Sequence, residues 1–215
     1  MAFATVYYQQ IDPDFKGGME HGVGIRPLLF KAGQTEPEAD DWGAIGAWSY
    51  GLSRAMDYLE KDNDADSRRV AVMGHSRLGT TALWTGAIDT RFAMVLASCS
   101  GEGGDSPARR NYGETTRNLV DKFPFWFCRN FQKYADHSDQ LPIDAHKLIA
   151  LSAPRPMYIT SAEQDLEADA KGMFLACVAA GPVYKLLGGQ DLAIDRMPGL
   201  NQPLTIGNSS CSSPI

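Results

Sequence analysis

The sequence lacks several features that mark particular classes of protein. No stretch approaches the roughly 18 consecutive apolar residues of a membrane-spanning helix. Positive charge is not in excess, because 20 lysines and arginines stand against 26 aspartates and glutamates, for a net charge of -6. The N-terminus lacks the basic segment and small-residue cleavage site of a secretory signal. We therefore expect neither nucleic acid nor membrane as a partner, and the chain itself leaves its localisation open.

Cysteine is scarce and widely spaced. The chain has four cysteines and no C-x-x-C pair. Zinc and dithiol redox sites usually need such paired spacing, so we expect no metal and no cofactor. The simplest interpretation of Cys99, Cys128, Cys177 and Cys211 is that they are buried free thiols, which pack as small apolar side chains.

Apolar, strand-like runs alternate with segments of helical periodicity along much of the chain. The expected strands cover residues 1–8, 68–74, 91–101, 156–161 and 183–187, and the expected helices 41–61, 79–89 and 170–182. This alternation predicts an α/β fold with a mainly parallel sheet and helices on both faces. Reactive groups in such folds gather at the carboxyl ends of the strands. We assign residues 1–207 to one domain and 208–215 to a Ser-rich tail without regular structure.

One strand–turn–helix segment has the features of a nucleophile elbow, the tight turn that presents a catalytic serine above a sheet. Residues 74–79 read GHSRLG, and small residues flank Ser76. The usual pattern is G-x-S-x-G, so the second glycine comes one residue late. A serine that caps the following helix would explain Ser76 equally well. Arg77 can supply positive charge to an oxyanion, or it can form a surface salt bridge.

Motifs spread over most of the chain carry a resemblance to a known family. They include VAVMGHSRLG, RRNYGET, FPFWFC, APRP and AAGPVYKLLG. Together they resemble the bacterial glucuronoyl esterases of carbohydrate esterase family 15, in which the elbow has the form G-x-S-R-x-G. The resemblance implies an α/β-hydrolase fold. It also implies a serine esterase that cleaves esters of 4-O-methyl-glucuronic acid in lignin–carbohydrate complexes through an acyl-enzyme.

The resemblance also implies roles for individual residues. Ser76 matches the nucleophile, and Arg77 matches the arginine that stabilises the oxyanion. Asp165, in the segment SAEQDLEAD, matches a position of the acid that orients the catalytic histidine, although an Asx-type turn would also account for it. Glu163 and Glu102 are weaker candidates for the same acid.

Other positions agree or disagree with the family pattern. Glu114 matches a residue that contacts the sugar hydroxyls. Cys99 stands where some members have the acidic residue, Thr80 stands in place of a lysine, and Glu167 in place of a tryptophan. The changes at Thr80 and Glu167 weaken the expected recognition of the uronate, and Cys99 removes one of the two positions for the acid.

The catalytic histidine of the family lies downstream of a segment that matches LNQP, and no histidine follows His146 in this sequence. His21, His75 and His137 lie elsewhere, and none matches the position of the base. We therefore expect a chain truncated at both ends, which lacks N-terminal strands of the sheet and the C-terminal histidine loop.

Three hypotheses follow for the function. The first is a glucuronoyl esterase with plant cell-wall glucuronoxylan as its substrate. The second is an acetylxylan or short-chain carboxylesterase, and the third is a carbohydrate-binding pseudo-enzyme without a base. An exposed sheet edge predicts an aggregation-prone monomer or a homodimer. Family members are secreted or periplasmic, which suggests export.

Overall fold

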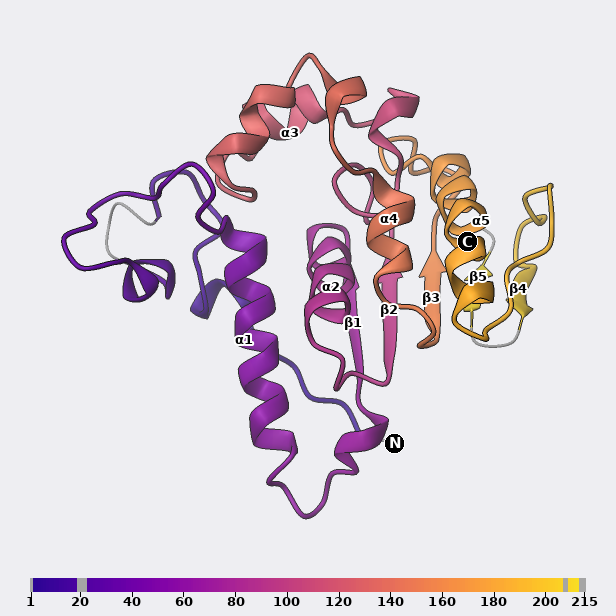
Figure 1. Cartoon of the computed structure of the whole chain (residues 1–215), viewed down its shortest axis with the longest axis horizontal. Helices are drawn as coiled ribbons and strands as arrows, with labels where there is room; N and C mark the ends of the chain where they lie inside the picture. Colours follow the sequence, from indigo (N-terminus) through magenta and orange to yellow (C-terminus); the bar gives the residue numbers. More distant parts are fainter. Residues whose placement is uncertain (1, 19–22, 207–208, 213–215) are drawn as a thin grey trace.

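A five-stranded sheet forms the centre of the computed structural model, which describes residues 2–18, 23–206 and 209–212 (Figure 1). The strands are β1 (Ala71–His75), β2 (Met94–Ser98), β3 (Met157–Thr160), β4 (Pro203–Ile206) and β5 (Ser209–Ser212). Their order in the sheet is β1-β2-β3-β5-β4. All neighbouring pairs are parallel except β4 and β5, which are antiparallel. The mainly parallel sheet predicted from the alternating pattern is therefore confirmed.

Five α-helices accompany these strands: α1 (Ala44–Leu59), α2 (Arg77–Ile88), α3 (Thr116–Lys122), α4 (Ala145–Ala150) and α5 (Ala170–Leu186). Alternate strand residues point into one hydrophobic core, because side chains alternate between the two faces of a strand. Val72, Val95 and Ile159 are at most 3% exposed there. Side chains of α1, α2, α4 and α5 complete the same core, with Met56, Leu83, Ile149 and Met173 among them.

The opposite face of the sheet differs from the expectation of helices on both faces. Met73, on β1, is 65% exposed, and Leu96 and Tyr158 on the neighbouring strands are only partly buried. Within the described residues, the helices that form the main core all pack on the other face.

The carboxyl ends of the parallel strands meet at one edge, where β1, β2 and β3 lead into residues 76, 99 and 161. His75 is paired in register with Ser98, and Ser98 with Thr160, so these three strand ends lie side by side. Residues 102–144 pass over this edge and include α3 (Figure 1). A second apolar cluster joins that segment to the N-terminal half of α1 through Ile45, Trp48, Leu119 and Trp126.

The predicted strand over residues 183–187 is wrong, because this segment continues α5 to Leu186. Pro182 lies inside the helix. Packing of α5 outweighs the strand propensity of the β-branched and aromatic residues in this segment. Ala176, Ala180 and Tyr184 are buried at intervals of four residues, which is the spacing of one helix face.

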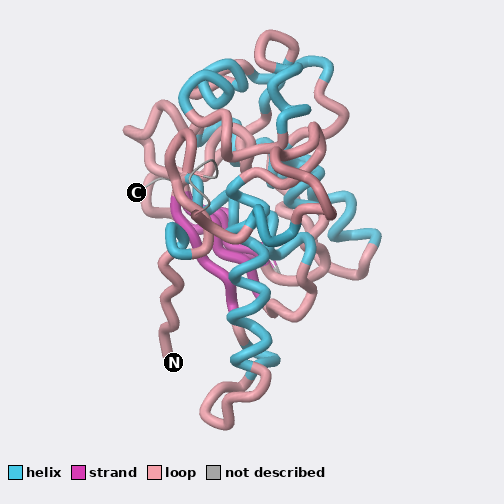
Figure 2. Tube along the Cα trace, turned by 90° about the vertical axis from the view of Figure 1, so that its left-hand side faces the viewer, coloured by secondary structure: helices cyan, strands magenta, loops and turns pink. Residues whose placement is uncertain are grey.

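Both chain ends also differ from expectation. Residues 2–7 form no strand and run into a 3₁₀ helix at Tyr8–Gln10 (Figure 2). A strand needs a partner edge, and strand propensity alone does not supply one. Ser209–Ser212, expected to be an irregular tail, form β5 between β3 and β4. Residues 208 and 213–215 of that expected tail lie outside the described residues.

α1 begins at Ala44, directly after Gly43. Gly43 precedes α1 without any side-chain capping hydrogen bond, although Asp40 and Asp41 stand just before it and aspartate often caps helices. No helix in the described part of the chain is long and apolar enough to cross a membrane.

Candidate active site

Ser76 occupies a strained turn between β1 and α2. Its φ of 55° and ψ of -130° lie outside the regions that L-residues normally adopt. Its backbone N–H donates to the carbonyl of Ser98 at 2.8 Å, which ties the turn to the end of β2. The Ser76 side chain makes no capping hydrogen bond to α2. The alternative of a simple helix cap is therefore wrong, and the turn has the strand–turn–helix form of a nucleophile elbow.

The two glycines of the GHSRLG segment permit close approaches of the backbone. A Cβ atom on Gly74 would lie 1.9 Å from the carbonyl oxygen of Leu78. A Cβ on Gly79 would lie 2.3 Å from Ser100 Oγ. The late glycine is thus needed where the first turn of α2 packs against the segment after β2, which explains the spacing G-x-S-x-x-G in physical terms.

A cavity of about 130 Å³ opens beside Ser76. Its walls combine hydroxyl, carboxylate, guanidinium and aromatic groups, from Ser76, Arg77, Thr80, Ser100, Glu102, Glu114, Phe123, Trp126, Phe127 and Glu167. The structure therefore brings together Ser76, Arg77 and Glu114, three of the four site residues predicted from the sequence. Thr80 and Glu167, the two departures at sugar-contacting positions of the family, lie in the same walls.

Arg77 does not form the surface salt bridge that the sequence left open. Its guanidinium contacts Asp14, whose side chain is 3% exposed, at 2.5 Å. The guanidinium also lies over the Trp126 ring at 4.7 Å and the Phe123 ring at 5.4 Å, distances at which a cation is attracted to an aromatic face. Arg77 is thus a partly buried cation in the wall of the cavity.

Glu102 and Glu114 add carboxyl groups to the cavity. Glu102 is 6% exposed and accepts a hydrogen bond from the Thr116 hydroxyl. Burial raises the pKa of Glu102 to about 7, and the neighbouring charges of Asp144 and Glu114 act in the same direction. Burial also raises the pKa of Glu114. Near neutral pH, Glu102 can therefore hold a proton and donate it in a hydrogen bond, unlike an ordinary glutamate.

The segment that bears Glu114 is fixed to the start of α5. The backbone N–H of Glu114 donates to the carbonyl of Glu167 at 3.0 Å. Arg110 Nε donates to Asp169 at 2.6 Å, and the Asp169 carboxylate is 1% exposed. Asp169 also caps α5 through the N–H of Gly172. The RRNYGET and SAEQDLEAD motifs are therefore connected by direct contacts.

Asp165 lies close to the site but outside the cavity wall. It is partly buried, and its Oδ1 accepts a hydrogen bond from the Ala168 N–H at 3.2 Å, which is the local turn expected as the alternative. Burial raises the pKa of the Cys99 thiol, and the negative charge of Asp165 adds to this effect. Cys99 itself has a φ of 46°, directly after β2. Glu163 is exposed and does not line the cavity.

The base predicted to activate Ser76 has no candidate in the described cavity. His75, His137 and His146 are not among the residues that line it. His75 contacts Ser98 Oγ at 3.2 Å instead. His21 lies outside the described residues.

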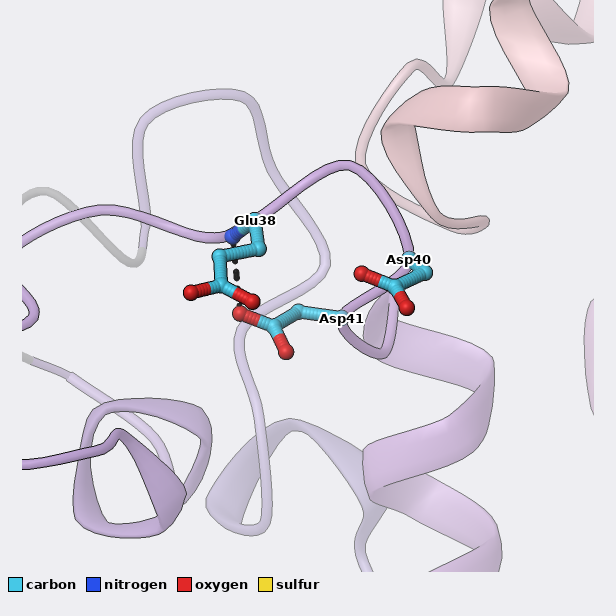
Figure 3. A group of neighbouring side chains, drawn as sticks. All are labelled: Glu38, Asp40 and Asp41. Atoms are coloured by element: carbon cyan, nitrogen blue, oxygen red, sulfur yellow. Dashed lines mark hydrogen bonds between the residues drawn. The ribbon is translucent and has the colours of Figure 1, made fainter.

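One group of acidic side chains lies within reach of a common point in the described part of the chain, away from the cavity. Glu38, Asp40 and Asp41 come together before α1 (Figure 3). Lys31 binds Glu38 at 2.6 Å, and Asp41 accepts the backbone N–H of Glu38 at 2.7 Å. These protein contacts account for the arrangement, and we assign the cluster no function.

Sequence reasoning missed two parts of the site. Asp14 comes from a loop 63 residues before Arg77, and no local pattern connects the two. The aromatic wall of Phe123, Trp126 and Phe127 comes from the FPFWFC motif, whose aromatic density was the available signal.

The parallel sheet, the turn at Ser76 and the helix that follows it define an α/β-hydrolase. A family model described as "Glucuronyl esterase, fungi" matches residues 36–188, and the chain belongs to this family.

Individual relatives support this assignment. The carbohydrate esterase MZ0003, from an unknown prokaryotic organism, is 51% identical over 199 residues, which cover 93% of this chain and 45% of that protein. The 4-O-methyl-glucuronoyl methylesterase of Podospora anserina is 34% identical over 98% of this chain and 44% of its own length. The solved glucuronoyl esterase from Solibacter usitatus is 51% identical, with a TM-score of 0.91 over 97% of this chain and 52% of that one. The chain spans about half the length of these relatives.

Proposed function

We propose that this chain contributes the nucleophile, oxyanion site and part of the sugar site of a glucuronoyl esterase. The strained turn that presents Ser76 beside a polar and aromatic cavity is the observation on which the proposal rests. Family membership and the names of the relatives support esters of 4-O-methyl-glucuronic acid as the substrate class. Glucuronoxylan is the polymer that would present such an ester.

The proposed reaction is acyl transfer through serine. Ser76 Oγ attacks the ester carbonyl while a base takes its proton and passes it to the departing alcohol, and the C–O bond to that alcohol breaks. Water then attacks the acyl-enzyme, which releases the uronic acid and restores the Ser76 hydroxyl. Arg77 would stabilise the oxyanion with its guanidinium and with its backbone N–H, which has no intrahelical acceptor because Arg77 is the first residue of α2. Asp165 is our proposal for the carboxylate that would orient an imidazole base, which the described residues of the cavity wall do not include.

The charges around the cavity favour a neutral ester over the free acid. Glu102, Glu114 and Glu167 line the cavity, and the positive charge of Arg77 is already paired with Asp14. A uronate ester is neutral, whereas its hydrolysis product is a carboxylate that these groups repel. Carboxylates and aromatic faces also suit the hydroxyls and the apolar ring face of a sugar. We infer that the site binds the ester and releases the acid.

Ester turnover by the chain tests the proposal. We expect methyl 4-O-methyl-glucuronate to be hydrolysed faster than p-nitrophenyl acetate, and Ser76→Ala to abolish both activities. Faster turnover of the acetate would favour the simple-ester hypothesis. Turnover that survives in Ser76→Ala would refute a role for Ser76.

A non-catalytic sugar-binding module is the second candidate, since no imidazole lines the described cavity. It predicts that the chain binds methyl glucuronate without turning it over, and that Glu114→Gln weakens this binding. Binding accompanied by turnover would exclude it.

We also propose that the chain self-associates through β1. This strand is at one end of the sheet and carries the exposed Met73. Among the described strands none pairs with its outer side, so the N–H and C=O groups there offer an edge to a second copy. Light scattering that shows a monomer at all concentrations would contradict this. Export of the protein stays a prediction.

A further inference from the structure

Asp14 is a buried carboxylate whose two oxygens are both occupied. Its Oδ2 accepts hydrogen bonds from Arg77 at 2.5 Å and from the Tyr8 hydroxyl at 3.0 Å. Its Oδ1 accepts one from the Trp126 indole N–H at 2.8 Å. The three donors come from three separate segments, and the carboxylate is 3% exposed. A carboxylate so placed fixes the position of each donor.

The guanidinium of Arg77 is held from two directions. Asp14 binds one of its nitrogens, and the aromatic face of Trp126 lies 4.7 Å away. Trp126 is itself stacked on Phe123, with ring centroids 3.9 Å apart and planes 2° from parallel. Because Asp14 also binds the Trp126 indole, the same carboxylate positions both the cation and the ring beneath it.

This arrangement leaves donors free for a reacting oxygen. A guanidinium has five N–H groups, and in the described structure Asp14 is the hydrogen-bond acceptor that Arg77 contacts. Arg77 lines the same cavity as Ser76, so its remaining N–H groups can face an oxyanion there. Oxyanion stabilisation depends on donors that are oriented before the reaction, and an arginine side chain without fixed contacts samples many rotamers.

We propose that Asp14 is a positioning residue for Arg77, holding its guanidinium at the oxyanion site of the ester hydrolysis proposed above, on which this inference rests. The competing explanation is that Asp14 merely anchors the N-terminal loop to the FPFWFC segment. The two explanations differ in what Asp14 does once Arg77 has been removed.

The first test is a double-mutant cycle on kcat, with Asp14→Asn, Arg77→Gln and the double variant. We expect Asp14→Asn to lower kcat between about 10- and 100-fold with KM changed less than about threefold, because misplacement of one preorganised group has effects of this size. The double variant should be no slower than Arg77→Gln. Effects that multiply independently would overturn the proposal, since Asp14 would then act without Arg77.

Asp89→Asn is the matched control. Asp89 is also a buried carboxylate paired with an arginine, at 2.7 Å from Arg91. It follows the last residue of α2, roughly 18 Å along the helix from Arg77. We expect it to lower the melting temperature and leave kcat unchanged. A kcat loss equal to that of Asp14→Asn would show that the effect is one of general stability, and would overturn the proposal.

A second readout is independent of turnover and, when made on the wild-type chain, of the folding of any variant. In the chain labelled with ¹⁵N-arginine, the Nε–H of Arg77 should have an order parameter near that of rigid backbone, about 0.85. The exposed Arg69, for which the described structure shows no side-chain hydrogen bond, serves as the reference. An Arg77 as mobile as Arg69 would overturn the proposal.

The two readouts also separate failure of the positioning from failure of the function. A rigid Arg77 that Asp14→Asn releases, in a chain without ester turnover, supports the positioning and refutes the hydrolysis. Turnover combined with a mobile Arg77 refutes the positioning and leaves the hydrolysis standing.

Discussion

Replacement of Glu102 by glutamine should remove a pH-dependent loss of stability. Glu102 is 6% exposed, and burial raises its pKa from 4.5 to about 7. The folded state therefore holds a proton at pH values where the unfolded chain has released it. Since the folded pKa is the higher one, stability is fully present below pH 4.5 and declines as the pH rises through 7.

The size of this effect follows from the two pKa values. Each pH unit between 4.5 and about 7 corresponds to about 1.36 kcal/mol, so ionisation of Glu102 costs roughly 3 kcal/mol of unfolding free energy. Burial also raises the pKa of Asp105 to about 7, which adds a second loss over the same pH range. Glu102→Gln cannot ionise, and its amide oxygen can still accept the hydrogen bond from Thr116. In this variant, the part of the pH-dependent stability loss that comes from Glu102 should disappear, and the part from Asp105 should stay.

Urea unfolding followed by circular dichroism at pH 4.5 and pH 8 measures the difference. We expect Glu102→Gln to match the wild type at pH 4.5 and to exceed it by up to about 3 kcal/mol at pH 8. Glu163→Gln, the same substitution at an exposed site, should leave the pH dependence unchanged. Equal stability of Glu102→Gln and wild type at both pH values would refute the assignment of a protonated carboxyl to the cavity.

Three further predictions concern the turn, the contacts near α5 and the product. Gly74→Ala places a Cβ 1.9 Å from a backbone oxygen and should lower the unfolding free energy by about 3 kcal/mol; a loss under about 1 kcal/mol would mean that the turn relaxes freely. Asp169→Asn breaks the pair with Arg110 and should lower the unfolding free energy by about 2–3 kcal/mol, whereas Asp136→Asn, in an exposed pair, should cause a clearly smaller loss. Equal losses would contradict the role of the buried pair. Free glucuronate should inhibit ester hydrolysis more strongly at pH 5.5 than at pH 8, because protonation of Glu102 on acidification removes a negative charge that repels the product. Inhibition that is constant with pH would contradict this repulsion.

The parts predicted correctly from the sequence depend on neighbouring residues. The β1–turn–α2 unit follows from an apolar run, small residues around Ser76 and a helical pattern, all within about twenty positions of one another. Residues 183–187 misled the prediction because Val183 and Tyr184 favour strands, whereas burial of Tyr184 on one face of α5 decides the outcome. Local residue type is also insufficient before α1, because Asp41 accepts the backbone N–H of Glu38 and does not cap the helix.

The remaining parts of the site depend on contacts between distant segments. Asp14 meets Arg77 across 63 residues and Trp126 across 112. The pKa of Glu102 is raised mainly by burial of its side chain. No periodicity in the sequence encodes this burial. Ser209–Ser212 have little apolar character and form a strand because β3 and β4 offer edges on both sides. In each case tertiary structure determines the property.

Covalent labelling of Ser76 by a fluorophosphonate tests the central claim most directly. The tryptic peptide of residues 70–77 contains Ser76 as its single serine, so mass spectrometry can locate the adduct without ambiguity. The account predicts a phosphonyl adduct on this peptide and its loss in Ser76→Ala. It also predicts slower labelling in Arg77→Gln, where loss of the cleavage site extends the peptide to residues 70–91 with Ser76 still its single serine. An unlabelled peptide 70–77, or labelling of another serine that persists in Ser76→Ala, would contradict the claim that the turn presents a catalytic nucleophile.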